Sequence, residues 1–404
     1  MKNINTELLI VGAGLTGLCT AGILSGLGYK ITIIDKNKLG EPYFKTGDSR
    51  TTAISEGSKK ILNEFGFWKK IAPYSEPIKK IKVCDRKTVN KIEFSNDKVN
   101  ENLGYIVENK ILKKIFYEKI TKCKNIKIID EFDVNYLDTN SLHISIKSEK
   151  KIINSNLLIA ADGKFSPLRK LLKITTFEKN YNHSALFLNI LHAKNHNNQA
   201  FEIFKQSGPL AILPMKKKYN SFQSSIIWSH NPNFIKGIVN SDNLNQVIKN
   251  EVSHYLGNIK KISNKKIFNL SAHINSTFYS DRVVFVGDSA HSVHPIAGQG
   301  WNLGIRDIHS LFKVLKEGKE LGLELGNNTV LRKYNNKTFY DAFILYHITD
   351  KLNSVFSVEN ILVKKLRNLG IDYIDNNKTI NSLIASYAMG KKINLFNWLK
   401  NTSS

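Results

Sequence analysis

Residues 6–17 read TELLIVGAGLTG, in which a short apolar run leads directly into a glycine-rich turn. Residues 15–27 then show the spacing of apolar side chains that is typical of a helix, and residues 30–35 form a second run rich in β-branched residues. A strand, a helix and a second strand in this order predict a β-α-β unit. We therefore expect the chain to open with an α/β domain.

The glycine-rich turn carries the pattern G-x-G-x-x-G at Gly12, Gly14 and Gly17. The first glycine permits a tight turn, the second lets the backbone approach a pyrophosphate, and the third lets the helix pack on the strand. The helix N-terminus then faces the phosphate charge. Asp35 closes the second strand, where an acid binds ribose hydroxyls. The pattern predicts a dinucleotide site and leaves FAD and NAD undistinguished.

Two further acids follow predicted strands. The stretch LLIAADG ends a buried run with Asp162 and Gly163, and the stretch RVVFVGD repeats the arrangement with Gly287 and Asp288. Ligands of open α/β sheets bind outside the carboxyl ends of the strands, so we expect both acids to lie near the first glycine turn. For Asp162 taken alone, an ordinary Asx turn explains the pattern equally well.

Residues 289–307 read SAHSVHPIAGQGWNLGIRD and form the most informative segment of the chain. A proline and two glycines predict an extended turn, which leads into a helix. Backbone amides at the start of that helix would suit a negative charge that develops on a ring. The candidate residues of this turn are Pro295, Gly298, Gln299, Gly300 and Asn302. No Cys or acid completes a metal-ligand set with His291 and His294, so we expect no metal.

The composition excludes several classes of protein. The 404 residues allow two or three domains, and 42% hydrophobic with 23% charged residues is typical of a globular chain. Cys19, Cys84 and Cys123 are too widely spaced for a disulfide framework or a zinc ribbon, which favours a reducing compartment such as the cytoplasm. We expect no signal peptide, and no apolar stretch approaches the ~20 residues that span a bilayer.

The formal net charge is +25, but only seven of the 59 basic residues are arginine. A basic nucleic-acid-binding protein is not expected, because arginine is scarce and no helix-turn-helix, zinc-finger or RNP1 pattern is present. The lysines indicate either a solvated basic surface or an attraction to acidic lipids or anionic ligands. Both alternatives stay open from the sequence.

Taken together, the three motifs resemble the flavoprotein aromatic hydroxylases that are built like p-hydroxybenzoate hydroxylase. The stretch AHSVHPIAGQG at residues 290–300, followed by NLG, is similar to the signature of the ubiquinone-biosynthesis hydroxylases. Further matches are Asp48, Arg50 and residues 53–55, 103–109, 208–214 and 388–390. The chain departs from the pattern at Trp301, at Ile203 and at residues 181–183, which leaves the substrate open but not the cofactor.

The resemblance implies FAD as the cofactor and NADPH or NADH as the electron donor, with a ferredoxin as the alternative. The implied FAD ligands are Gly12, Gly14 and Gly17 at the pyrophosphate, Asp35 at the adenosine ribose, Asp288 at the ribityl chain, Arg50 near the flavin, and Asp162 with Gly163 touching both FAD and the pyridine nucleotide. No catalytic side chain is implied, because the chemistry belongs to the cofactor.

The activity that the resemblance implies is that of a class A flavoprotein monooxygenase. An oxygen atom from O2 passes, through a flavin C4a-hydroperoxide, to the ring of a polyprenylated phenol in ubiquinone biosynthesis. The alternatives are a small-phenol hydroxylase, a halogenase or a prenyl reductase of the same fold. From a different class, a non-enzymatic quinone or lipid carrier with a vestigial nucleotide site is the remaining hypothesis.

The expected fold class is α/β, with a Rossmann-like FAD-binding domain, an inserted antiparallel-sheet substrate domain and C-terminal helices. We assign residues 1–75, 100–180 and 273–315 to the FAD-binding domain, 76–99 and 181–272 to the substrate domain, and 316–404 to the helical region. Near the end, Phe396 and Trp398 lie between lysines. They either pack on the core or attach the protein peripherally to the inner membrane or to a quinone-biosynthesis complex.

Overall fold

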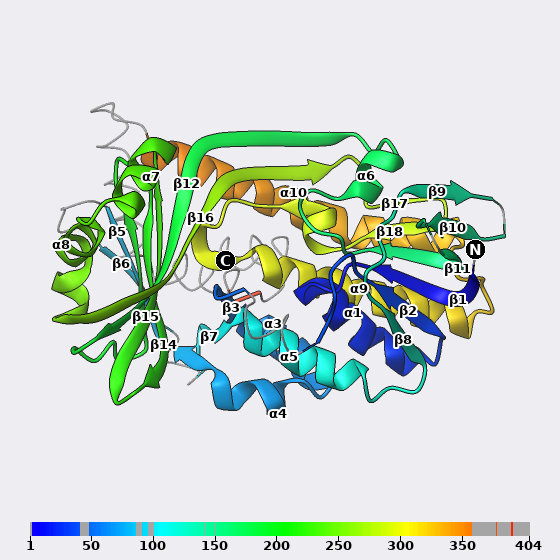
Figure 1. The fold of residues 1–404 in the computed structure, drawn as a ribbon, viewed down its shortest axis with the longest axis horizontal. Helices are drawn as coiled ribbons and strands as arrows, with labels where there is room; N and C mark the ends of the chain where they lie inside the picture. The colour runs from blue at the N-terminus through cyan, green and yellow to red at the C-terminus, as the bar shows by residue number, and fades with distance from the viewer. Residues whose placement is uncertain are drawn as a thin grey trace, which may run out of the picture.

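The computed structural model describes residues 2–40, 48–85, 91–95, 101–140, 142–149, 151–357, 377 and 389–390. Phe396 and Trp398 lie outside these residues. Three sheets organise the described chain, and two of them have eight strands each (Figure 1). The predicted mixture of an α/β part and an antiparallel part is therefore present.

The first sheet contains the predicted β-α-β unit, in which β1 and β2 are parallel neighbours joined by α1 (Leu15–Leu24). Its strands run in the order β17-β18-β11-β1-β2-β8, and β10 and β9 continue from β11. The bounds are β1 Lys2–Val11, β2 Ile31–Ile34, β8 Ile126–Ile129, β9 Tyr136–Thr139, β10 Ile144–Lys147, β11 Lys151–Ala160, β17 Tyr279–Ser280 and β18 Val283–Phe285. Since β1, β11 and β18 are parallel, their carboxyl ends meet at one edge.

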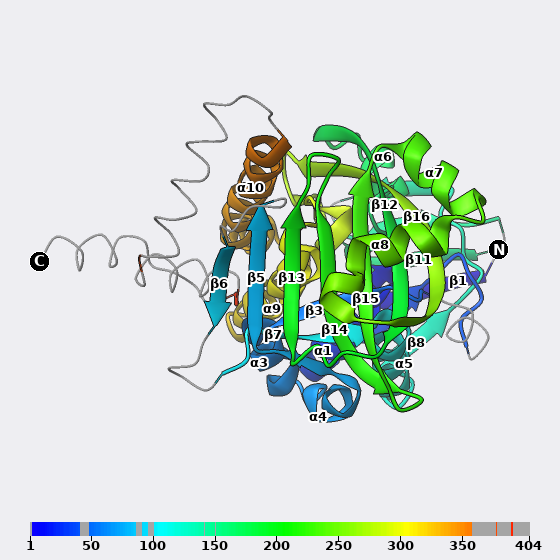
Figure 2. The same ribbon diagram turned by 90° about the vertical axis from the view of Figure 1, so that its left-hand side faces the viewer.

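The second sheet runs in the order β19-β16-β12-β15-β14-β13-β5-β6. Its neighbours are antiparallel except for the parallel pair of β13 and β5. The bounds are β5 Lys80–Asp85, β6 Lys91–Ser95, β12 Thr176–His192, β13 Gln199–Phe204, β14 Leu210–Lys218, β15 Ser221–His230, β16 Ile259–Asn275 and β19 His291–Ser292. Two helices, α7 (Pro232–Asn240) and α8 (Leu244–Leu256), cover one face of this sheet (Figure 2).

A third, three-stranded sheet lies between the two larger ones and consists of β3 (Thr51–Ser55), β7 (Gly104–Glu108) and β4 (Glu76–Ile78). The second sheet extends beyond the predicted substrate domain, because β12 begins at Thr176, β16 ends at Asn275, and β19 lies within the range assigned to the FAD-binding domain. The division into domains stays a proposal.

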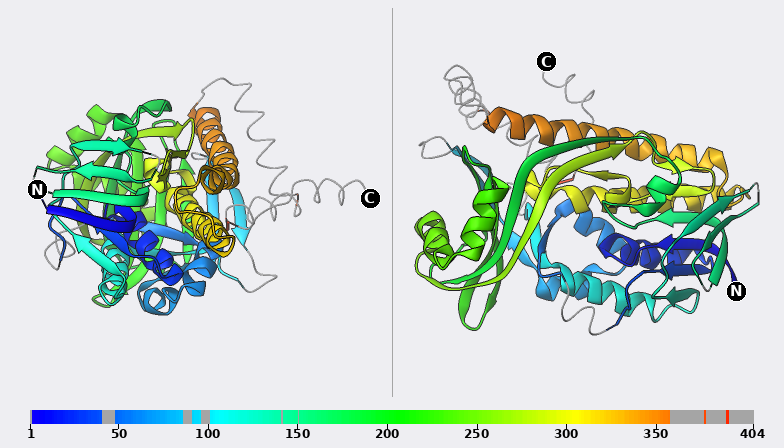
Figure 3. Two further views of the ribbon diagram at one scale, coloured as in Figure 1. Left: turned by 90° about the vertical axis from the view of Figure 1, so that its right-hand side faces the viewer. Right: turned by 45° about the horizontal axis from the view of Figure 1, so that its top comes forward.

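The remaining helices cover the first sheet and connect it to the second. Their bounds are α3 Glu56–Glu64, α4 Trp68–Ile71, α5 Asn109–Ile120, α6 Pro167–Leu171, α9 Gly300–Glu320 and α10 Asn328–Ser357, with short 3-10 turns η1 Ser25–Leu27, η2 Ala72–Tyr74, η3 Gly287–Ser289 and η4 Ile296–Gly298. The long α10 runs beside both large sheets (Figure 3). Within the described part of the chain, no helix has the length and apolar character needed to cross a bilayer.

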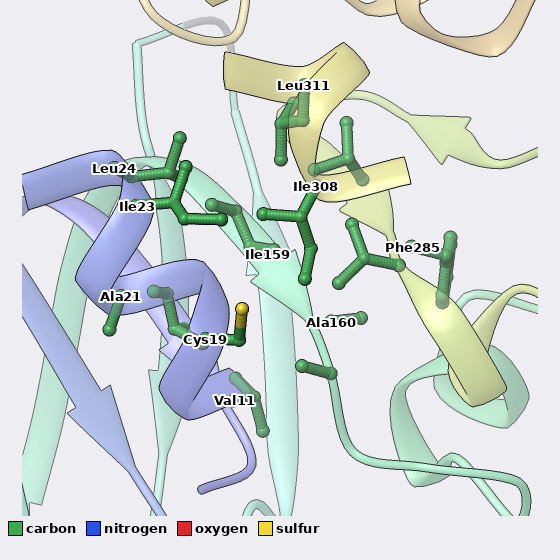
Figure 4. Close-up of a cluster of buried hydrophobic side chains, with 14 of the residues drawn as sticks. Val11, Cys19, Ala21, Ile23, Leu24, Ile159, Ala160, Phe285, Ile308 and Leu311 are labelled. Carbon is green, nitrogen blue, oxygen red and sulfur yellow. The ribbon is translucent and has the colours of Figure 1, made fainter. Parts of the chain in front are cut away.

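The main core holds the edge of the first sheet in place. Ile23 and Leu24 of α1 and Ile308 and Leu311 of α9 converge on Ile159 of the central strand β11 (Figure 4). All five side chains are fully buried. Because close-packed interiors do not deform easily, the loops that follow β1, β11 and β18 start from fixed positions.

Candidate functional site

The first glycine turn leaves β1 at the edge where the parallel strands end. Gly12 has a φ of +103°, and a Cβ there would lie 2.4 Å from the carbonyl oxygen of Ala161. A Cβ at Gly17 would lie 1.8 Å from the carbonyl oxygen of Gly12, so the helix could not pack against the strand. At Gly14, by contrast, an added Cβ would meet no atom within 4 Å. Gly12 and Gly17 are therefore required for close packing, whereas Gly14 faces open space.

The open space is a cavity of about 260 Å³, whose lining includes Gly12, Gly14, Asp35, Asp162 and Gly163. The structure thus brings together five of the predicted site residues from the ends of three strands. Asp35 also braces the turn, since one of its oxygens accepts a hydrogen bond from Ala13 N at 2.7 Å. Its other oxygen accepts bonds from the backbone and side-chain nitrogens of Asn37.

The donors and acceptors around this cavity fit the phosphate and sugar groups of FAD. The first turn of α1 contains no acidic residue, so its positive end is available to a phosphate. Asp162 Oδ1 is buried and has no hydrogen-bond partner among the described residues, and an unpaired acceptor of this kind suits a sugar hydroxyl. The residues present are therefore compatible with the cofactor that the sequence predicts.

The Asp162 loop is fixed by its own hydrogen bonds. Asp162 Oδ2 accepts bonds from Ser166 Oγ at 2.7 Å and from Leu168 N at 3.2 Å, while burial raises the pKa of its carboxyl. Arg169 donates to the carbonyl oxygens of Lys164 and Ser289, at 2.7 and 3.2 Å. One guanidinium thereby joins the loop after β11 to the turn after β18.

Asp288 lies in the turn η3, directly after β18. Its side chain is exposed, yet the surrounding protein desolvates the carboxyl and raises its pKa, and the charges of His291, Arg50 and Lys164 oppose that rise. Arg50 and Asp288, which are remote in sequence, are therefore electrostatic neighbours.

Arg50 is held by a bidentate ion pair with Asp48. Its Nε and a terminal nitrogen donate to the two carboxylate oxygens at 2.7 and 2.6 Å, and Asn109 Nδ2 donates to the same carboxylate at 2.9 Å. Although burial acts in the opposite direction, these bonds hold the pKa of Asp48 well below its usual range. The guanidinium carbon lies 4.7 Å from the ring centroid of Phe268 on β16. Arg50 thus connects the third sheet to the second.

The turn before α9 was predicted to offer bare backbone amides from Gly298 onward, but Gly298 N donates to Pro295 O at 3.0 Å. Gly298 has a φ of +61°, and the first helical hydrogen bond of α9 runs from Leu303 N to Gln299 O at 3.0 Å. The amides of Gly300, Trp301 and Asn302, at the start of α9, therefore have no acceptor within the helix. A Cβ on Gly300 would meet no atom within 4 Å, so a side chain at this position would project into open space.

Asn302 was predicted to offer its backbone amide to the cofactor, and its side chain has a separate, structural role. Its Oδ1 accepts a bond from Ser55 N and its Nδ2 donates to Ala53 O, both at 2.8 Å. The side chain is buried and holds β3 against the turn, and only its backbone amide remains for a proposed cofactor role.

The two histidines of the segment pack inside the protein. His291 Nε2 lies 2.6 Å from Asp307 Oδ2, and that oxygen also accepts a bond from Gly287 N at 3.0 Å. His294 is fully buried against Tyr181, and burial lowers the pKa of its imidazole to about 4. Asp307 was not predicted as a site residue from the sequence. Its position, as an acid at the end of the glycine-rich segment, could have identified it.

The chain is similar to known proteins along most of its length. The model of a family described as "FAD binding domain" matches residues 5–336. A ubiquinone hydroxylase (UbiM) of Neisseria meningitidis is 27% identical over 96% of this chain and 85% of its own length. The 3-demethoxyubiquinol 3-hydroxylase of Escherichia coli is 26% identical over 96% of this chain and 100% of its own length. The family resemblance inferred from the motifs is confirmed.

Solved structures share the fold at low sequence identity. The p-nitrophenol 4-monooxygenase PnpA of Pseudomonas putida superposes with a TM-score of 0.80 at 15% identity, covering 97% of this chain and 99% of that one. A single-residue variant of HpxO from Klebsiella pneumoniae, complexed with FAD, gives a TM-score of 0.73 at 15% identity, covering 96% and 99%. The predicted fold class is confirmed.

Proposed function

Because the chain belongs to the FAD binding domain family and is a flavoprotein monooxygenase, we propose that it hydroxylates the aromatic ring of a polyprenylated phenol in ubiquinone biosynthesis. The observation that carries the proposal is the match to ubiquinone hydroxylases along nearly the whole chain, including both large sheets. The glycine-rich turn, the acids at the strand ends and the amides at the start of α9 are the groups with which such an enzyme would bind its cofactor.

We assign the cofactor contacts to the residues at the sheet edge. Gly12, Gly14 and Gly17 would admit the pyrophosphate, Asp35 the adenosine ribose and Asp288 the ribityl chain. FAD, once bound and reduced, supplies the activation of O2. The chain itself would orient the ring, exclude water and stabilise charge through the amides of Gly300 to Asn302. NADPH or NADH is the proposed electron donor, and Asp162 with Gly163 would touch both nucleotides.

A polyprenyl tail is poorly soluble, so the substrate must reach the enzyme from a membrane surface or from a partner protein. Two properties of the sequence support peripheral attachment: the net charge of +25 and the lysine-flanked aromatic residues near the C-terminus. The residues that would make this contact lie outside the part of the chain that the structure describes.

The decisive experiment combines a reconstituted reaction with genetics. The purified protein is loaded with FAD and given 2-farnesylphenol, O2 and either NADPH or NADH, and the hydroxylated product is identified by mass spectrometry. Deletion of the gene in its host should cause the matching unhydroxylated quinone precursor to accumulate. A normal quinone profile in the deletion strain, with no product in the reaction, would refute the proposed substrate.

Replacing Asp288 by alanine is expected to weaken FAD binding about tenfold or more. A ribityl hydroxyl would lose a charged acceptor, and such a bond contributes about 1.5–3 kcal/mol. FAD affinity is measured by flavin fluorescence titration of the apoprotein, with Asp138→Ala on the exposed edge strand β9 as the control. Equal affinity in the Asp288 variant and the control would contradict the assignment.

A further inference from the structure

The hairpin that joins β14 to β15 ends in an exposed tip rich in lysine. Lys218 of β14 is paired with Ser221 of β15, which leaves Tyr219 and Asn220 as a turn of two residues. Residues 216–220 read KKKYN, and all five are exposed. The tip of the second sheet therefore carries three adjacent positive charges and an aromatic ring.

Tyr219 occupies this turn against its local preference. The φ angles of Tyr219 and Asn220 are +49° and +53°, in the left-handed region that two-residue hairpin turns require and that glycine or asparagine adopts most easily. The tyrosine is 81% exposed, so packing inside the protein does not explain its presence. An exposed ring that ends in a hydroxyl has the chemistry that the interface between water and a lipid bilayer favours.

Strand pairing brings other lysines to the same end of the second sheet. Phe222 of β15 is paired with His192 of β12, which is paired with Ile259 of β16. The residues that follow β12 and those that begin β16 therefore lie beside the hairpin. Lys260 Nζ confirms this arrangement, since it donates to Ser221 Oγ at 3.2 Å.

The helix α4 lies on the other side of the hairpin. Lys216 Nζ donates to the carbonyl oxygen of Pro73, in the 3-10 turn η2 that directly follows α4. The lysines of α4 thus join those of the sheet at one surface. We call this surface the basic end, and its exposed lysines are Lys69, Lys70, Lys194, Lys216, Lys217, Lys218, Lys260 and Lys261.

The positive charge of the basic end is not compensated locally. Acidic residues are absent from the four segments that carry these lysines, which are residues 68–75, 193–198, 215–222 and 256–264. The whole chain, by contrast, has 34 acidic residues for 59 basic ones. Among the residues that the structure describes, none of these lysines forms an ion pair, whereas Lys80 of the same sheet is paired with Glu93. Glu76, which follows the first segment, accepts a hydrogen bond from Asn198 Nδ2 at 2.6 Å.

An unpaired cluster of cations attracts a partner with negative charge. All the cations of the basic end are lysines, whereas arginine is the residue that reads bases and binds phosphate groups in pairs. Lysines suit the diffuse charge of an anionic bilayer, to which each contributes singly. The exposed ring of Tyr219 fits the same partner, so the observations favour lipid over nucleic acid.

The basic end and the candidate site share the strand β15. Ser225 Oγ accepts a hydrogen bond from Thr51 Oγ1 at 3.1 Å, and Thr51 follows Arg50 in β3. Ser225 is four residues from Ser221, where β15 begins beside the hairpin turn, and this corresponds to about 13 Å along a strand. A bilayer at the hairpin would therefore lie close to the elements that border the site.

We propose that the basic end docks the protein on an anionic lipid bilayer, with Tyr219 placed among the headgroups. This contact is separate from the aromatic residues near the C-terminus, and it adds described residues to the peripheral attachment proposed above. The inference rests on the proposed function only for its purpose, which is the collection of a polyprenylated substrate from the membrane. The docking itself does not depend on catalysis.

The test measures cosedimentation of the full-length holoenzyme with vesicles of phosphatidylcholine and phosphatidylglycerol. The variant combines Lys216→Gln, Lys217→Gln and Lys218→Gln. Since each lysine near an anionic surface contributes about fivefold in affinity, we expect the triple variant to bind about 100-fold more weakly than the wild type. High salt should release the wild-type protein, and vesicles of phosphatidylcholine alone should bind neither protein.

The matched control removes the same charge elsewhere by combining Lys122→Gln, Lys124→Gln and Lys127→Gln. These lysines are exposed and lie in β8 or just before it. The strand β8 and the β14–β15 hairpin lie toward opposite ends of the longest axis (Figure 1). We expect the control to bind the vesicles nearly as tightly as the wild type.

A second variant, Tyr219→Asn, separates membrane contact from folding. Asparagine adopts a positive φ more readily than tyrosine, so thermal unfolding should show a stability equal to or above that of the wild type. Vesicle binding should nevertheless weaken about fivefold, because the ring no longer enters the interface. Unchanged vesicle binding in this variant would contradict the role of Tyr219.

The outcomes separate this inference from the proposed function. Wild-type vesicle binding in the triple variant, or an equal loss in the triple variant and its control, would overturn the docking surface. Tighter binding of the wild type to a DNA duplex than to the vesicles would also overturn it. Hydroxylation of 2-farnesylphenol is measured without vesicles, where we expect the triple variant to match the wild type. If neither protein forms product while vesicle binding still requires the three lysines, the proposed function fails and the docking surface stands.

Discussion

A Gly14→Val variant is expected to fold normally and to purify without FAD. Gly14 precedes α1 with a φ of −72° and a ψ of −172°, an extended conformation that any residue adopts. A Cβ there meets no atom within 4 Å, so the apoprotein has room for the new side chain. That room is the cavity in which the pyrophosphate would approach the backbone, and the added methyl groups would fill it. We expect FAD affinity to fall at least about 100-fold, or about 3 kcal/mol.

The flavin absorbance per protein chain measures this loss, and circular dichroism of the apoproteins checks the fold. Gly26→Val is the matched control, because Gly26 also has no atom within 4 Å of an added Cβ but lies exposed beyond the end of α1. We expect the control to stay yellow. Stoichiometric FAD in the Gly14 variant would show that the cofactor does not pass over this turn.

A Gly300→Val variant should keep its FAD and lose hydroxylation by about 100- to 1,000-fold, the range seen when one charge-stabilising backbone or side-chain donor is removed. The amides before Leu303 have no acceptor within α9, and at Gly300 an added Cβ would project into open space. The valine side chain would therefore keep the flavin ring away from the amides without disturbing the packing of the helix.

Product formation and NADPH oxidation are measured together, since poor stabilisation of charge should uncouple the two and release hydrogen peroxide. Gly237→Val is the control: its added Cβ also meets no atom within 4 Å, and it lies on α7, on the helix-covered face of the second sheet. Hydroxylation at the wild-type rate in the Gly300 variant would remove the proposed role of these amides.

The sequence predicted those parts of the site that depend on local backbone geometry. Gly12 and Gly17 have neighbours that exclude any Cβ, and this requirement appears in the sequence as glycine at fixed spacing. The strand ends at Asp35, Asp162 and Asp288 were found because a buried parallel strand is a short apolar run that ends in a turn. Parallel pairing then brings such ends to one edge, which a fold-level rule anticipates.

The residues that contact one another across sheets were not predictable in the same way. The ion pair of Asp48 with Arg50, and the approach of Arg50 to Asp288 and Phe268, join segments that no periodicity connects. Asn302 was expected to offer its backbone amide to the cofactor, and nothing in the sequence indicated that its side chain bonds to Ala53 and Ser55 of β3. A polar side chain of a turn bonds to whichever backbone group the tertiary fold places beside it.

Glu202 and Glu93 show most clearly what the sequence alone determines and what only the tertiary structure determines. In the sequence both are glutamates in alternating strand patterns, and each is followed by an apolar residue. The sequence alone determined that both lie on strands, because strand formation follows from local pattern. Only the tertiary structure decided that Glu93 meets two lysines while Glu202 is paired with Ala211 and Val83 on the neighbouring strands. Desolvation and pairing depend on residues brought together from distant parts of the chain, so the properties of a carboxyl are settled by the folded neighbours it acquires.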